Sequence, residues 1–146
     1  MAVTQNAPFT IHLGGPGTNV NDLATSETVT PGHLLCRFNN GGVIRVKKHA
    51  TAAGSGPRLV VREQSMMNRG IADNYAASDL VEAVALGLGG SALMWIASGQ
   101  NIVAGAMMES AGDGTLRVLA AGVPLFTALE NSGAVTVLTR IRVEAV

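Results

Sequence analysis

The chain has 146 residues, and its ten basic and ten acidic side chains cancel to a formal net charge of +0. This length suits one domain that buries about two thirds of its unfolded surface. The balanced charge provides no overall field that would attract nucleic acid or an anionic membrane. Only 14% of the residues are charged, against roughly 25% in ordinary soluble domains, and 47% are hydrophobic. We therefore expect apolar surface to be covered by other copies or other proteins.

Residues 1–30 contain no lysine or arginine and are rich in Thr, Asn, Gly and Pro. Phe9, Ile11 and Leu13 alternate within this segment, which favours a short strand or a docking strip. We interpret residues 1–30 as an extended N-terminal arm whose three apolar side chains contact a neighbouring protein surface. Because the arm has no core of its own, deleting residues 2–30 is expected to leave the remainder folded.

From residue 33 onward the sequence has the apolar runs and turn residues that are typical of β-strands. Residues 33–38 and 43–49 read as two strands joined by the Asn39-Asn40-Gly41-Gly42 hairpin turn. Further strands are expected within residues 58–64 and 75–86, and a strand, turn and strand within residues 99–116.

The Asp113-Gly114 pair suits a turn that needs a positive φ at the glycine. Residues 92–97 and 124–130 are expected to form short helical turns. The segment from 134 to 146 is predicted to be a long strand whose Arg140 and Arg142 face away from Ile141. Residues 31–146 are therefore predicted to form a mainly β domain, a small β-barrel or sandwich with one or two short helices.

The candidate chemical motifs are incomplete. The glycine-rich stretches at 14–17 and 87–90 lack the Lys-Ser/Thr of a phosphate-binding loop, and no Gly-x-Ser-x-Gly elbow occurs. His12, His33 and His49 are scattered, and Asp113 lacks the neighbouring acidic ligands of a calcium loop. The sequence predicts no enzyme, no cofactor and no metal site.

Two alternatives concern partners. Arg45, Lys47 and Lys48 could touch nucleic acid, but no aromatic residue for base stacking lies among them, so a solvated strand face is favoured. The apolar stretch at 83–98 is interrupted by glycines and flanked by acidic residues, which argues against a membrane span. The opening residues lack the pattern of a signal peptide, so we expect synthesis in the cytoplasm.

The segment Leu93, Met94, Trp95 and Ile96 is a candidate subunit interface, because Trp and Met are enriched at such interfaces. Ordinary core packing is the competing interpretation of the same residues.

Several segments resemble tailed-phage capsid cement proteins, also called head-decoration proteins. These segments are residues 31–34, 46–50, 60–63, 71–81, 99–105, 110–116, 128–130 and 140–143. The most specific are the Tyr-Ala-x-x-Asp-x-Val segment and the later Ser-x-Gly-Asp-Gly-Thr segment. One departure is Ser78, which stands where the family pattern has glycine.

The resemblance implies a β-rich structural protein that binds the outer surface of an expanded phage head. It further implies a homo-oligomer, commonly a trimer, that contacts the major capsid protein and stabilises the shell against internal DNA pressure. In this setting Phe9, Ile11 and Leu13 would contact the capsid or a neighbouring subunit. A phage tail or fibre component is the alternative.

Overall fold

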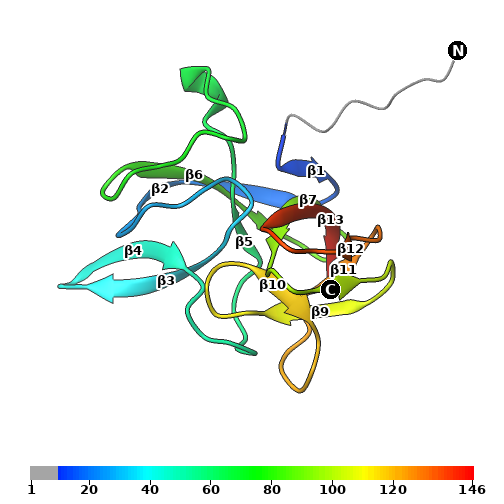
Figure 1. Cartoon of the computed structure of the whole chain (residues 1–146). Coiled ribbons are helices and arrows are strands. Elements are labelled where there is room, and N and C mark those ends of the chain that lie inside the picture. Colours follow the sequence, from blue (N-terminus) through cyan, green and yellow to red (C-terminus); the bar gives the residue numbers. More distant parts are fainter. Residues whose placement is uncertain (1–9) are drawn as a thin grey trace, which may run out of the picture.

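The structure, a computed structural model, describes residues 10–146 and consists almost entirely of β-strands (Figure 1). The first sheet contains, in spatial order, β1 (His12–Gly14), β7 (Ser91–Ile96), β10 (Leu116–Val118), β9 (Met107–Ser110), β11 (Phe126–Ala128) and β13 (Thr139–Ala145). The second sheet contains β2 (Gly17–Ala24), β6 (Leu80–Leu86), β5 (Leu59–Val61), β3 (Leu34–Asn40) and β4 (Val43–Lys48). A small ladder joins β8 (Asn101–Ile102) to β12 (Gly133–Ala134), and η1 (Ser65–Met67) is a 3₁₀ turn. The predicted mainly β fold is confirmed.

The first sheet closes into a small barrel. Strand β7 pairs with β10 on one side and runs antiparallel to β13 on the other, with Ile96 opposite Thr139 and Ser91 opposite Glu144. This second pairing joins the two ends of the sheet, so β7, β10, β9, β11 and β13 form a ring. Closure removes the exposed edges at which other chains could pair.

The second sheet curls until its two edge strands meet. Thr25, just after β2, forms an isolated bridge with Val46 of β4, and the Ser26 N–H donates to the Val46 carbonyl at 3.0 Å. The far end of the β3–β4 hairpin projects beyond this bridge (Figure 1).

Two hydrophobic cores lie on opposite faces of β5. Val60 belongs to the core that fills the barrel, whereas Leu59 and Val61 belong to the core enclosed by the second sheet. All three side chains are fully buried. A strand buried on both faces has a continuous apolar sequence instead of an alternating one, as the Leu-Val-Val of β5 does.

The two segments expected to be helical are strands. Residues 92–97 contain most of β7, and residues 124–130 contain β11. In β7 the alternation of Ala92, Met94 and Ile96 directs these side chains into the barrel, and Leu93 and Trp95 to its outer face. The intervening Leu93 and Trp95 are also apolar and at least partly buried, which hides the period of two. In residues 10–146 the helical content is the single turn η1.

Residues 10–30 are part of the fold, whereas an extended arm that docks on a neighbouring protein was expected. Strand β1 pairs with β7, and β2 pairs along β6 from Gly17 opposite Leu86 to Ala24 opposite Leu80. The segment contributes Ile11 to the barrel core and Val29 to the second core. The polar composition of residues 10–30 gave no strand signal in the sequence. These strands form because they pair with β7 and β6.

A buried carboxylate holds the beginning of this described segment. Glu63 accepts hydrogen bonds from the Thr10 hydroxyl at 2.7 Å and from the Ile11 N–H at 3.0 Å. Glu63 lies just after β5, so Thr10 and Ile11 are held at a fixed point beside both cores.

Deleting residues 2–30 is therefore expected to unfold the protein, because the deletion removes β1 and β2 along with Ile11 and Val29. Circular dichroism and thermal melting of the truncated chain measure this effect. Deletion of residues 2–9 alone is the control, and it leaves the described contacts in place. A cooperative melt of the longer deletion close to that of the full chain would contradict the assignment of residues 10–30 to the fold.

The turns at Gly114 and Ser78 have backbone conformations that favour glycine. Gly114 has φ +83°, as predicted for the Asp113-Gly114 turn, and a Cβ there would lie 3.0 Å from the Lys48 side chain. Ser78 has φ +76°, a conformation that L residues rarely adopt. The turn at Ser78 is fixed by the Ser78 N–H donating to the Thr25 carbonyl at 2.8 Å and by the Ala76 N–H donating to the Asp79 carboxylate at 2.9 Å.

Ser78→Gly is expected to stabilise the protein by about 0.5–1 kcal/mol, because relief of the left-handed conformation outweighs the added chain entropy of the unfolded state. Urea unfolding measures the difference. The matched control is Ala77→Gly, at a residue without positive φ, which is expected to destabilise the chain by a similar amount. Equal destabilisation by both substitutions would contradict the strain at Ser78.

Candidate interaction surface

A surface hollow lies on the outer face of the β7–β13 pair. Leu93 and Trp95 of β7 stand opposite Arg142 and Arg140 of β13 in the antiparallel register. Directly opposed residues share a face of a sheet, so these four side chains form the floor of a groove of about 420 Å³. We call this hollow the β7–β13 groove; its remaining lining residues are Ile71, Glu130, Leu138 and Thr139.

Trp95 and Arg140 form a rigid pair in the floor of the groove. The Arg140 guanidinium carbon lies 4.1 Å from the centre of the Trp95 ring, which is a cation–π contact. The Pro31 carbonyl accepts from Trp95 Nε1 at 3.0 Å and from Arg140 Nε at 3.1 Å. Arg140 Nη2 also donates to the Ile71 carbonyl. Both side chains are therefore fixed before any partner arrives, which lowers the entropic cost of binding.

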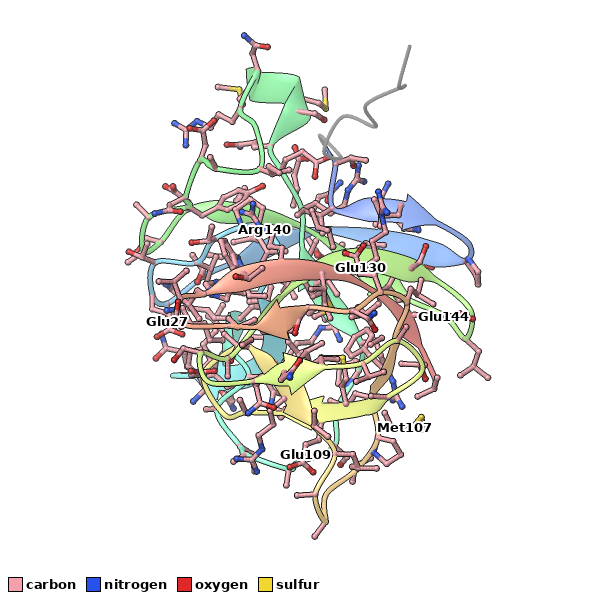
Figure 2. All side chains as sticks on the ribbon, turned by 45° about the vertical axis from the view of Figure 1, so that its right-hand side comes forward. Glu27, Met107, Glu109, Glu130, Arg140 and Glu144 are labelled. Carbon is pink, nitrogen blue, oxygen red and sulfur yellow. The ribbon has the colours of Figure 1, made fainter. Side chains whose placement is uncertain are left out.

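The rim of the groove combines charged and apolar side chains. Glu130 Oε2 lies 3.5 Å from Arg142 Nη1, and Glu130 Oε1 accepts from the Arg142 N–H at 2.9 Å. Leu138 is 52% exposed beside them. In Figure 2 the labels of Arg140, a residue of β13, and of Glu130, from the segment after β11, lie close to the β13 ribbon. An apolar, aromatic and arginine-lined groove is suited to contact with another protein.

A buried acidic side chain on the outer face of the barrel, Glu109, is held by structural contacts. Glu109 is fully buried and accepts hydrogen bonds from Arg117 Nε and from the Gly122 N–H, both at 2.8 Å. Burial alone would raise the pKa of Glu109, but these hydrogen bonds hold it below its ordinary value. A Cβ at Gly122 would lie 2.4 Å from the carboxylate, so glycine is required there for this close approach.

Within residues 10–146, no three His, Cys, Asp or Glu side chains are grouped closely enough to hold a metal ion. Over the same residues the structure has no helix of the length and apolarity needed to cross a bilayer.

The candidate interface at 93–96 separates into two sets. Met94 and Ile96 are fully buried in the barrel core, so a partner cannot reach them in this fold. Leu93 is 8% exposed and Trp95 is half-buried, and both line the groove. Met94 and Ile96 are therefore core residues, whereas Trp95 remains a candidate for contact with a partner protein.

Ile11 and Leu13 likewise do not form a free docking strip. Ile11 is fully buried in the barrel core, and Leu13 is partly buried against it. Phe9 lies outside the described residues. Ile11 is therefore removed from the candidate contacts because it is part of the protein's own interior.

Sequence reasoning missed most of the groove. Alternation in the sequence placed Arg140 and Arg142 on the polar face of a strand. The pairing of this strand with residues 92–97 was not expected, because those residues were predicted to be helical. Ile71, Glu130 and Leu138 come from connecting segments, and only the tertiary fold brings them together.

The fold defines a mainly β protein built on a small closed barrel and a curled second sheet. A similar fold occurs in the head fiber gp8.5 N base of bacteriophage phi29, known from a crystal structure, with a TM-score of 0.56 and 13% sequence identity. The alignment covers 90% of this chain and 97% of that chain. This identity is low, so the comparison establishes a shared fold alone. Neither a protein-family model nor a curated protein matches the sequence.

A buried histidine next to the groove makes stability depend on pH. His33 packs 6.2 Å from the Trp95 ring, and its Nδ1 accepts from the Thr30 N–H at 3.0 Å. Burial, followed by the positive charge of Lys48, lowers the pKa of His33 to about 4. The unfolded chain therefore binds more protons than the folded chain between pH 6.5 and 4.

We expect the free energy of unfolding to fall as the pH decreases from about 6.5 to about 4, by at most on the order of 3 kcal/mol from this group. Urea denaturation at a series of pH values measures the change. His33→Asn keeps a hydrogen-bond acceptor but does not titrate, so this variant is expected to lose much of the dependence in that window. Identical pH profiles for the two proteins would contradict the lowered pKa.

Proposed function

We propose that this chain is a structural protein of a phage virion that binds the outer surface of an expanded capsid and stabilises the shell against internal DNA pressure. The observation that carries the proposal is the likeness of fold to a phage head-fiber base over 90% of the chain. The ordered motifs that resemble head-decoration proteins support the same role independently of the fold comparison.

The surface chemistry supports a binding role. The low charged fraction leaves apolar side chains such as Val137 and Leu138 outside the core. In the proposal the major capsid protein is the partner and the chain acts as a homo-oligomer, with a trimer as the expected form. Several weak contacts on one oligomer bind a symmetric shell tightly through effective concentration.

The β7–β13 groove is the proposed contact with the capsid. Trp95 and Arg140 are of the residue types that dominate binding energy in protein interfaces, and both are held in place by the Pro31 carbonyl. Leu138 provides exposed apolar area at the rim. A capsid loop with an apolar residue and a hydrogen-bond acceptor fits such a groove.

A second candidate function is the base of a fibre or another tail or fibre component. The description of the similar phage protein as a head fiber base favours this alternative specifically. The two functions differ in copy number, because decoration of a shell requires far more copies than a set of fibres or a tail.

Co-sedimentation of the purified protein with undecorated, expanded heads of the phage that encodes it tests the proposal. We expect binding to saturate at a copy number related to the symmetry of the shell. Leu138→Asp is expected to weaken binding about tenfold or more, because it places a charge at the rim of a partly apolar contact.

The matched control is Leu88→Asp, at a residue that is 78% exposed in the turn before β7; it is expected to bind like the original chain. Absence of binding to intact expanded heads would overturn the decoration function. Saturation at a few copies per particle would favour the fibre alternative, and equal loss in both variants would remove the groove from the contact.

A further inference from the structure

The second sheet separates positive from negative charge between its strands. No acidic residue occurs from 28 to 62, the stretch that supplies β3 and β4, and no lysine or arginine occurs from 70 to 116, the stretch that supplies β6. Strand β2 lies within the first 36 residues, which also contain no lysine or arginine. In the strand order β2-β6-β5-β3-β4, the strands without basic residues, β2 and β6, come first and the strands without acidic residues, β3 and β4, come last.

The positive side is the β3–β4 hairpin. Arg45 stands opposite Phe38 and Lys47 opposite Cys36, so both cations lie on one face of the hairpin, as the sequence predicted. Lys47 Nζ lies 4.9 Å from the centre of the Phe38 ring. At the tip, Val43 and Ile44 are 59% and 48% exposed. We call residues 37–47 the basic hairpin.

The negative side is the end of the β2–β6 pair, where Asp22 lies in an irregular part of β2 and Glu82 lies in β6. Leu80, 60% exposed, gives this side an apolar residue as well. Arg62 lies nearby, but it donates to the Asn19 side chain at 2.8 Å. We call residues 20–24 together with 79–82 the acidic strand pair.

Within residues 10–146 neither surface forms an ion pair inside the molecule. The ion pairs between residues 10 and 146 join Arg62 to Glu63, Arg117 to Glu109 and Arg142 to Glu130. None of these pairs includes a side chain of the basic hairpin or of the acidic strand pair. Unpaired charge of one sign beside exposed apolar side chains is a surface suited to a partner of opposite charge.

The two surfaces lie at the same end of the sheet. The bridge between Thr25 and Val46 ties the end of β2 to β4, and the tip of the hairpin extends beyond it. Figure 1 shows the tip of the β3–β4 hairpin and the β2–β6 end on the same side of the molecule, away from β11 and β12.

We propose that the basic hairpin of one copy docks onto the acidic strand pair of a second copy. This contact is head to tail because it joins two different surfaces, so each copy can bind one neighbour through its hairpin and another through its acidic strands. A head-to-tail contact of this kind forms a closed ring when the rotation between successive copies closes, and an open chain when it does not. The inference rests on the homo-oligomer of the proposed function, but it does not require a capsid.

Sedimentation-velocity ultracentrifugation of the full chain, without capsids, tests the contact as a function of salt. We expect an oligomer whose dissociation constant rises at least about tenfold between low and high ionic strength, because the contact is electrostatic. Arg45→Glu with Lys47→Glu, and separately Asp22→Lys with Glu82→Lys, are each expected to weaken self-association at least about tenfold. Combining all four substitutions in one chain restores complementary charges and is expected to recover the oligomer.

Arg69→Glu, on the exposed turn after η1, is the control for a change of charge outside both surfaces. Thermal melts monitor folding, and Asp22→Lys alone replaces the double variant if Glu82→Lys impairs it. A monomer at all concentrations, or an oligomer that withstands both reversals, would overturn the inference. Failure of a salt-sensitive oligomer to bind expanded heads would instead overturn the proposed function and leave this contact intact.

Discussion

The structure depends on the burial of β5 on both of its faces. Its three residues supply side chains to two separate cores, and burial of each is worth about 1.5–3 kcal/mol. Arg58, immediately before β5, extends this coupling because its Nη2 donates to the Val146 carbonyl at 2.6 Å. The barrel and the second sheet are therefore parts of one cooperative unit, and the groove and the charged surfaces keep a fixed relation to each other.

Where the turn chemistry is strong, the sequence predicts the structure well. The hairpin of β3 and β4 and the turn at Gly114 are confirmed, because Asn-Gly and Asp-Gly turns depend on local backbone conformation. Strand β7 was not predicted because both of its faces are apolar, one packed in the barrel and the other forming part of the floor of the β7–β13 groove. Residues 10–30 were misread for the opposite reason, since exposed polar side chains along β2 conceal a strand that is held mainly by its pairing with β6.

The candidate surface was predictable only in part. Trp95 stands out in a chain with few aromatic residues, and the alternation around Arg140 marks a half-polar strand. Their stacking depends on the β7–β13 register and on the Pro31 carbonyl, which lies far away in the sequence. At position 78 the family resemblance and the structure agree. The family pattern has glycine there, and Ser78 has the positive φ that glycine adopts most easily.

Closure of the barrel by β13 has a consequence for the order of folding during synthesis. All strands of the second sheet are present once residue 86 has left the ribosome, whereas the barrel cannot close before residues 139–145 are available. During that interval Val60, Val84 and Leu86 belong to a core whose other half does not yet exist. The nascent chain therefore presents an apolar sheet face to the cell, and chaperone binding or premature association at that face competes with completion of the fold.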